Sequence, residues 1–375
     1  MPSPIIEITD LARGGSGVGR LQGPDDRTPG CVIFVPFTLP GDHVRVRITQ
    51  QEKRFAHAEL VEIIKPSPER QVPPCAVFGR CGGCQWQHVP YPLQWKTKVS
   101  GVSQALQRAK IEMPSDLEQF PAENPWHYRN RIQLRGSQND LGFFATGTNT
   151  LIPASGCDIA RPAINQAWEQ TKTEGAALGQ PYKVEVEVLV DETIRRTWNS
   201  RTGSAGFRQV NDAQNEKLRA WVAKAISPGL EIYDLFGGSG NLSLGLAPQM
   251  KMIHCVDVSS PSDAPLGTPN GFQFHRKSVL AWLIAEARSL KKSEVQARSA
   301  ILDPPREGLG KDFEGIASSL EKLGVRQIIA VGCDPDAWAR DLSKFILRGW
   351  KLEKAAVLDF FPQTSHVESV GVLIK

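Results

Sequence analysis

The run Asp234-Leu235-Phe236-Gly237-Gly238-Ser239-Gly240-Asn241 lies between a strand expected over 232–235 and a helix expected over 242–247. Glycines at such a junction let the backbone turn tightly and approach a ligand closely. Asp257 ends the next expected strand, where a carboxylate can accept hydrogen bonds from ribose hydroxyls. The run therefore predicts a nucleotide-cofactor site, and a tight turn in a cofactor-free sheet is the alternative. Its spacing differs from G-x-G-x-x-G, which counts against NAD or FAD.

The residues around this turn alternate between strand and helix candidates. A helix is expected before it, over 215–226, and the strand candidates are 232–235, 253–256, 272–275, 300–302 and 327–331. Strands that alternate with helices predict a parallel sheet with crossover helices. We therefore expect an α/β fold with a Rossmann-like domain over residues 212–375.

Two later strand candidates end in residues that can do chemistry. One is followed by Asp303-Pro304-Pro305-Arg306, a stiff non-helical loop, and the next by Gly332-Cys333-Asp334-Pro335. Ligands of open α/β sheets bind outside the carboxyl ends of the strands. Asp-Pro-Pro loops at this place are typical of S-adenosylmethionine enzymes that methylate bases. We therefore expect the glycine turn, Asp303 and Cys333 to border one crevice. For Cys333 the alternative is a buried structural cysteine.

The N-terminal residues 1–66 have the pattern of a small all-β domain. Short apolar runs alternate with turns such as Leu39-Pro40-Gly41-Asp42, and five short strands can close into a barrel. The order of Gly17-Val18-Gly19-Arg20, the run 32–36 and the Pro-Gly turn resembles a TRAM domain, an RNA-binding barrel. An unrelated β-barrel is the alternative. Residues 67–211 predict a mixed α/β or mainly β central domain.

Cysteine usage indicates a metal site. Of the seven cysteines, Cys75, Cys81 and Cys84 fall within ten residues, and Cys157 is the natural fourth ligand. Four thiolates suit zinc or an iron–sulfur cluster, and the spacing does not separate the two. Cys31 and Cys255 lie in apolar strand candidates and are expected to be structural.

Five ordered motifs resemble the uracil-5 RNA methyltransferase family over essentially the full length of the chain. Besides the glycine turn, Asp303–Arg306 and Gly332–Pro335, they are Phe207-Arg208-Gln209-Val210-Asn211 and Phe361-Pro362-Gln363-Thr364-Ser365-His366-Val367-Glu368. The resemblance implies methylation of uridine C5 in RNA with S-adenosyl-L-methionine. It implies Cys333 as the nucleophile and Glu368 as the general base.

The resemblance also implies ligand-binding residues. For the cofactor these are Gln209, Phe236, Asn241, Asp257 and Asp303. For a structural [4Fe–4S] cluster they are Cys75, Cys81, Cys84 and Cys157; Cys81-Gly82-Gly83-Cys84 followed by Gln85-x-Gln87-His88 favours the cluster over zinc. The segment 126–131, Trp-His-Tyr-Arg-Asn-Arg, combines aromatic and basic residues, which suit RNA contacts or an exposed strand.

The composition limits the other classes of function. A net charge of +4 permits RNA as a partner without requiring it, and no run of residues is apolar enough for a membrane span. We expect a cytoplasmic protein with no obligate protein partner. Ribosomal RNA, specifically 23S, is the preferred substrate and uridine-54 of transfer RNA the runner-up. A non-catalytic RNA-binding or ribosome assembly factor is the alternative of another class. A DNA cytosine methyltransferase is disfavoured because its Pro-Cys motif is absent.

Some positions depart from the family pattern. Lys277-Ser278 replaces an expected Gly-Asp that contacts adenine, so Ser278 is a substitute candidate. Asp334 replaces a common asparagine beside the nucleophile. The proline- and serine-rich segment 258–271 predicts a short or broken helix.

Overall fold

The structure is a computed structural model that describes residues 3–21, 30–113, 117–200, 208–261, 265, 267–290 and 296–375. The chain forms two compact units. Unit 1 comprises Met1–Lys98, Glu123–Arg201 and Phe361–Ser365, and unit 2 comprises Val99–Ala122, Thr202–Phe360 and His366–Lys375. Helix α1 (Tyr91–Arg108) begins in unit 1 and ends in unit 2.

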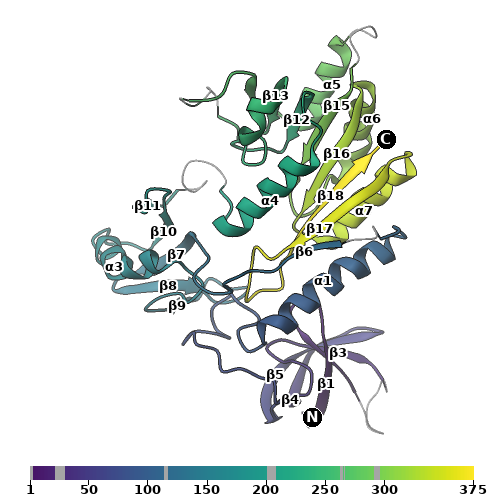
Figure 1. Cartoon of the computed structure of the whole chain (residues 1–375). Coiled ribbons are helices and arrows are strands. Elements are labelled where there is room, and N and C mark those ends of the chain that lie inside the picture. Colours follow the sequence, from purple (N-terminus) through teal and green to yellow (C-terminus); the bar gives the residue numbers. More distant parts are fainter. Residues whose placement is uncertain are drawn as a thin grey trace. The chain divides into compact units, whose positions relative to one another are not determined.

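The N-terminal part of unit 1 is a closed five-stranded barrel (Figure 1). Its order is β1-β2-β3-β5-β4, where the strands are β1 (Ile5–Leu11), β2 (Gly17–Arg20), β3 (Val32–Val35), β4 (His43–Gln51) and β5 (Phe55–Lys65). Alternate residues point into a small apolar core that includes Ile33, Val44 and Ala56. Cys31 is part of that core, as expected for a structural cysteine. The predicted five-stranded barrel is therefore confirmed.

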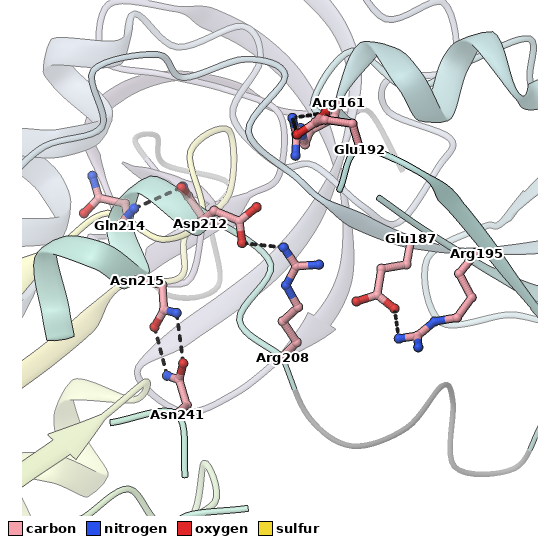
Figure 2. A network of polar contacts seen from close by, with 10 residues as sticks. Arg161, Glu187, Glu192, Arg195, Arg208, Asp212, Gln214, Asn215 and Asn241 are labelled. Carbon is pink, nitrogen blue, oxygen red and sulfur yellow. Dashed lines mark hydrogen bonds and ion pairs between the residues drawn. The ribbon is translucent and has the colours of Figure 1, made fainter. Parts of the chain in front are cut away.

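The rest of unit 1 is built on a second antiparallel sheet. Its order is β11-β10-β7-β8-β9, from β7 (Arg131–Ser137), β8 (Asp140–Phe144), β9 (Leu151–Pro153), β10 (Tyr182–Val188) and β11 (Ile194–Trp198). Two short helices, α2 (Pro162–Gln166) and α3 (Trp168–Ala176), cover one face, where Ile132, Trp168 and Val184 share a core. On β10 the buried Glu187 accepts a hydrogen bond from Arg195 at 2.6 Å, which offsets the burial of its charge (Figure 2).

Unit 2 is an open eight-stranded sheet with the order β14-β13-β12-β15-β16-β18-β17-β6 (Figure 1). Its strands are β6 (Leu117–Phe120), β12 (Glu231–Leu235), β13 (Met252–Val256), β14 (Phe272–His275), β15 (Arg298–Leu302), β16 (Val325–Gly332), β17 (Lys351–Leu358) and β18 (Glu368–Ile374). The helices are α4 (Asp212–Ala225), α5 (Val279–Ser289), α6 (Phe313–Lys322) and α7 (Pro335–Leu347), with the 3₁₀ helices η1 (Leu244–Gln249) and η3 (Gly310–Asp312).

The sheet is parallel apart from one inner strand, β18. From β14 to β16 all neighbours are parallel, as the alternating pattern predicts, and β18 pairs antiparallel with β16 and β17. The α/β fold with a Rossmann-like domain is therefore confirmed. The expected helix over 242–247 is instead the 3₁₀ helix η1, which contains Pro248. Proline lacks the N–H that an α-helix interior requires, which explains the difference. Part of the segment 258–271 lies outside the described residues.

The three domains expected over 1–66, 67–211 and 212–375 remain a prediction. The barrel strands end at Lys65, close to the first boundary. Strand β6 falls within the expected central domain by sequence, yet it pairs with β17 of the large sheet. Residues 361–365 belong to unit 1, although they follow the large sheet in sequence.

Candidate active site and cysteine-lined cavity

The glycine-rich turn follows β12 directly, at the carboxyl edge of the parallel strands. Phe236 has a φ of 63°, a left-handed conformation that is uncommon for a bulky residue, and its N–H donates to the carbonyl of Val256 at 2.9 Å. Asp234 is fully buried beneath the turn and accepts a hydrogen bond from Ser243. A Cβ on Gly237 would lie 2.5 Å from the Asp234 carboxylate. The turn is thus closely packed on a buried carboxylate.

Burial also changes the proton affinity of that carboxylate. It raises the pKa of Asp234 to about 6, although hydrogen bonds from Ser243 and Cys255 oppose the change. Cys255 is buried beside it, and burial raises the pKa of its thiol as well. The structural role expected for Cys255 agrees with this position. Asp234 is the first residue of the glycine-rich run 234–241, and the sequence did not predict that its side chain is buried.

Asn241, at the end of the turn, is held by a residue that sequence reasoning missed. The side-chain amides of Asn241 and Asn215, on α4, exchange two hydrogen bonds of 2.9 Å (Figure 2). Asn211 caps the same helix by accepting from the N–H of Gln214 at 3.2 Å. Gln209 is buried just before the helix, and Phe207 lies outside the described residues. The start of α4 and the cofactor turn are therefore joined through Asn215.

Asp257 follows β13, at the same edge of the sheet. Its carboxylate accepts from the N–H and the hydroxyl of Ser259 at 2.6 and 2.7 Å. The side chain is half-buried and accessible to a ligand at the sheet edge. Ser278 is exposed and precedes α5, and no side-chain capping bond occupies its hydroxyl. Its proposed part in adenine contact stays a prediction.

Cys333 and Glu368 lie at the ends of two neighbouring strands. Cys333 follows β16 directly, and Glu368 is the first residue of β18. Because the two strands are antiparallel and Gly332 pairs with Ser369, the end of one meets the beginning of the other. Asp303 follows β15, whose Leu302 is in register with Ala330 of β16. The sheet therefore brings Asp303, Cys333 and Glu368 to one place, as the strand-end argument expected for the first two.

Burial and nearby carboxylates raise the pKa of all three groups. Burial and the charge of Asp303 raise the pKa of Glu368 well above its ordinary value. Enclosure by the protein, with the charges of Asp234 and Asp257, raises the pKa of Asp303 to about 7. Burial and the negative charges of Glu368 and Asp303 raise the pKa of the Cys333 thiol to about 11, while Arg306 opposes this. Both carboxyl groups therefore keep their protons to a higher pH than free carboxyl groups do.

Arg306 supplies the positive charge at this site. Its guanidinium lies 3.0 Å from Nδ1 of His366, two residues before Glu368. In the sequence, Arg306 and His366 stood out only as members of two motifs. In the structure the two side chains join the loop after β15 to the segment before β18.

The loop after β15 is also joined to the helix that follows Cys333. Asp334 caps α7 by accepting from the N–H groups of Asp336 and Ala337 at 3.0 and 2.9 Å. Further along α7, the buried Asp341 accepts from the N–H of Leu309 at 2.6 Å. A small cavity of about 20 Å³ lies between this loop and α7, with Cys333 and Trp338 in its lining. Asparagine could form the same cap as Asp334, so this departure from the family pattern has a simple explanation.

The aromatic and basic segment around Tyr128 is largely structural. Tyr128 is buried and its hydroxyl donates to the carbonyl of Pro362 at 3.1 Å, within unit 1. The side chain of Arg129 donates to the carbonyl of Arg131 at 3.0 Å. Asn130 is fully buried. Tyr128 and Asn130 are therefore not part of an exposed strand, and RNA contacts by the rest of the segment stay a prediction.

Cys75, Cys81, Cys84 and Cys157 line one cavity of about 180 Å³ in unit 1, together with Arg129 and Gln87. Burial and the neighbouring thiols raise the pKa of Cys84 to about 12. Burial also raises the pKa of Cys157, to about 11. All four cysteines are free of disulfides. Among the described residues, no three His, Cys, Asp or Glu side chains converge closely enough to hold a single metal ion.

No helix in the described part of the chain has the length and apolar character that a membrane span requires.

The fold and the site together define a Rossmann-like α/β domain whose candidate residues lie at the carboxyl ends of the parallel strands. Residues 6–61 match the TRAM domain, and residues 285–375 match the family described as tRNA (Uracil-5-)-methyltransferase. The chain therefore contains a TRAM domain and a domain of the tRNA (uracil-5-)-methyltransferase family.

Relatives extend this similarity over the whole chain. A 23S rRNA (uracil(1939)-C(5))-methyltransferase RlmD of Chromohalobacter salexigens is 28% identical, over 99% of this chain and 89% of the relative. An uncharacterized RNA methyltransferase of Bdellovibrio bacteriovorus is 28% identical, over 98% of this chain and 94% of the relative.

One solved structure has the same fold. It is the Pyrococcus abyssi tRNA (uracil-54, C5)-methyltransferase in complex with S-adenosyl-L-homocysteine, with a TM-score of 0.71 and 19% identity, covering 98% of this chain and 99% of that one.

Proposed function

We propose that the protein methylates C5 of a uridine in 23S ribosomal RNA, with S-adenosylmethionine as the methyl donor and Cys333 as the covalent nucleophile. The observation that supports this most directly is the pairing of Gly332 with Ser369, which brings the Cys333 thiol and the buried Glu368 carboxyl to the same strand ends. A nucleophile and a proton acceptor at one place are what a covalent addition and elimination on a pyrimidine ring require.

The first half of the reaction requires Cys333 as a thiolate. Uracil C5 is a poor nucleophile, and addition of the Cys333 sulfur to C6 makes C5 enolate-like, so that it can attack the methyl group. Burial and two carboxylates hold the thiol protonated in the free protein. Arg306 opposes this rise in the pKa of the thiol. The thiol proton passes to Asp303, so that Glu368 stays ionised for the second half of the reaction. S-adenosylmethionine supplies the methyl group when it is bound.

The second half requires a base. After methyl transfer, C5 bears both the methyl group and a proton. Removal of that proton by Glu368 re-forms the C5–C6 double bond and expels the Cys333 sulfur. The raised pKa of Glu368 matches this task, because a stronger base accepts a proton from carbon more readily. The uridine must leave any base stack to reach these groups.

Five residues are proposed to hold the cofactor: Gln209, Phe236, Asn241, Asp257 and Asp303. The half-buried Asp257 suits the ribose hydroxyls. The strained backbone at Phe236 suits close approach of a ligand, because such strain gathers at functional sites. The side chain of Asn241 is already paired with Asn215, so we propose that this pair fixes the turn.

The choice of ribosomal RNA rests on the relatives. Those with a specified substrate include 23S rRNA methyltransferases that match nearly the whole chain, TRAM domain included. Transfer RNA is the second candidate, because the solved structure with the same fold is a tRNA enzyme. Either reaction agrees with the expected cytoplasmic location.

The first experiment traps the covalent adduct. Total RNA substituted with 5-fluorouridine is incubated with the purified protein and S-adenosylmethionine. Fluorine at C5 cannot leave as a proton does, so the enzyme should remain attached to its RNA. We expect an adduct that requires the cofactor and disappears in Cys333→Ala, and sequencing of the trapped RNA would identify the substrate.

The control is Cys31→Ala, because Cys31 lies in the barrel core. This variant should still form the adduct. If wild-type protein binds RNA and forms no adduct, the protein is an RNA-binding or assembly factor instead.

We further propose that Cys75, Cys81, Cys84 and Cys157 bind a structural [4Fe–4S] cluster. Four thiols around one cavity fit the donor set of such a cluster. The run Cys81-Gly82-Gly83-Cys84 followed by Gln85-x-Gln87-His88 resembles the family pattern, and this resemblance favours the cluster over zinc. A cluster would join Cys157 to the three earlier cysteines and would have no part in methyl transfer.

The test is the iron content and visible absorbance of protein purified without oxygen. We expect about four iron atoms per chain in the wild type and in Cys31→Ala, and a large loss in Cys84→Ala. Zinc in place of iron, or unchanged iron in Cys84→Ala, would contradict the assignment.

A further inference from the structure

Three aromatic rings form a cluster on the outer surface of the N-terminal barrel. Phe34 lies on β3, and Phe55 and His57 lie on the adjacent strand β5. The rings of Phe34 and His57 stack with centroids 5.6 Å apart. Phe55 contacts Phe34 and His57 edge-on, at 6.0 and 5.5 Å. Alternate residues such as Ile33 and Ala56 fill the core, so the cluster faces outward.

The aromatic cluster is accessible. Phe55 is 38% exposed, His57 is exposed, and Phe34 is half-buried. Single apolar side chains are common on surfaces, whereas a contiguous group of them usually marks a contact site. The proposed reaction acts on a macromolecule, and the aromatic cluster is a candidate for binding it.

The charge beside the aromatic cluster favours an anionic ligand. Lys53 and Arg54 lie in the turn between β4 and β5 and are exposed, and neither forms an ion pair with an acidic side chain among the described residues. The acidic residues of β5 are already paired: Glu59 with Arg47, and Glu62 with Arg45 at 3.3 Å. Glu52 accepts from Gln50 at 2.9 Å. The cations next to Phe55 are therefore available.

The barrel topology gives a second reason. The strand order β1-β2-β3-β5-β4, closed by β1 on β4, is that of an OB-type barrel. Such barrels bind oligonucleotides on the face of their second and third strands and on the loop between the fourth and fifth. Phe34 lies on the third strand, and Lys53 and Arg54 lie in that loop.

We propose that Phe34, Phe55 and His57 form a stacking platform for an unpaired base of the RNA substrate, with Lys53 and Arg54 on the flanking phosphates. This inference rests on the proposed RNA substrate. Exposed ring faces stack on bases that have left a helix, and cations bind the backbone. Paired bases are already stacked on their neighbours, so the platform selects single-stranded segments over duplex.

Crosslinking tests the contact directly. An unstructured RNA with one 5-iodouridine is bound to Cys333→Ala protein, which cannot attack the halogenated base at the active site. Ultraviolet irradiation then joins the base to an aromatic ring stacked on it. We expect crosslinked peptides that contain Phe34, Phe55 or His57. Crosslinks confined to other residues would overturn the proposal.

Affinity provides the second measurement. The double variant Phe34→Thr/Phe55→Thr keeps residues that favour strands. It should bind unstructured RNA about 5- to 100-fold more weakly, with little change for a duplex of equal length. Val61→Thr is the matched control, because Val61 is an exposed apolar residue of β5 outside the aromatic cluster.

Several outcomes would count against the platform. Equal weakening in the control, equal weakening toward duplex, or concentration-dependent self-association of the wild type without RNA would each overturn it. The 5-fluorouridine adduct is measured separately on wild-type protein. A platform crosslink without that adduct would therefore reject the methylation proposal and leave the platform standing.

Discussion

At the scale of single residues, the two carboxyl groups beside Cys333 have raised pKa values because the protein encloses them. Asp303 has a pKa of about 7, and Asp303 in turn raises the pKa of Glu368 and Cys333. Both carboxylates must lose water on folding, which disfavours their charged forms. The protonated forms of Asp303 and Glu368 are therefore favoured in the folded protein.

We therefore predict that Asp303→Asn stabilises the folded protein above about pH 7 and impairs catalysis. A carboxyl whose folded pKa is raised contributes most stability below its unfolded pKa and loses it as the pH rises through the folded pKa. The stability of Asp303→Asn relative to the wild type should thus increase from about pH 4 to about pH 7 and remain constant above that. Thermal melts from pH 4 to 9 should show a gain of about 2–5 °C at pH 8.

Asp42 provides a control, because its pKa is lowered in the folded protein whereas that of Asp303 is raised. Burial alone raises its pKa, but hydrogen bonds from Arg70 and from the N–H groups of Ser67 and Leu39 outweigh burial and lower it. Its stabilising effect is present above the unfolded pKa, near 4, and is lost in acid. Asp42→Asn should therefore lower the melting temperature at pH 8. A loss of stability in Asp303→Asn at pH 8 would contradict our account of the site.

Single residues were predicted from sequence where a motif and a strand end coincide. Cys333 and Asp303 lie at the sheet edge as the strand pattern implied. Asn215 could not be found, because nothing local to α4 shows that its amide pairs with Asn241. Glu368 had support only from a resemblance, since its position depends on strand pairing distant in sequence.

At the scale of elements, the part of the large sheet formed by β18, β17 and β6 is what the sequence pattern did not predict. The parallel strands were predictable because buried apolar runs alternate with helices. By contrast, β6 has four residues without a clear pattern, and β17 begins with four mainly charged or exposed residues. Their pairing is set by distant partners. The active site needs this part of the sheet, because β18 supplies Glu368.

The loop after β15 gives a prediction at the same scale. Gly308 has a φ of 73°, and a Cβ there would lie 2.3 Å from Oδ2 of Asp341. Gly308→Ala should therefore break the Leu309–Asp341 bond and displace Arg306 from Cys333. We expect kcat to fall by at least about tenfold, since a displacement of about 1 Å has large effects on catalysis.

Gly310→Ala is the matched control. Gly310 also has a left-handed φ, of 52°, but a Cβ there would meet nothing within 4 Å. It should lose about 1 kcal/mol of stability from backbone strain alone, with kcat nearly unchanged. Equal losses of kcat in the two variants would show that strain, and not contact with Asp341, governs the loop.

At the scale of the whole molecule, the two kinds of candidate site belong to different units. All four cysteines of the cavity fall in unit 1, and every described residue proposed to bind the cofactor or react falls in unit 2. Each unit has sheets of its own, and unit 1 contains two separate apolar cores. The structural requirements for the cluster and for cofactor binding are thus separate.

This separation predicts that loss of the cluster leaves cofactor binding intact. In Cys84→Ala, the dissociation constant for S-adenosylmethionine, measured by calorimetry, should stay within about threefold of the wild type, a difference below about 1 kcal/mol. Proteolysis should become faster within residues 67–98 and 123–201, because Cys157 is no longer held to the earlier cysteines. Asp257→Ala should show the reverse, with weak cofactor binding and unchanged iron. If Cys84→Ala instead lost cofactor binding while unit 2 resisted proteolysis, the cluster would have a part in catalysis, and its assignment as purely structural would fail.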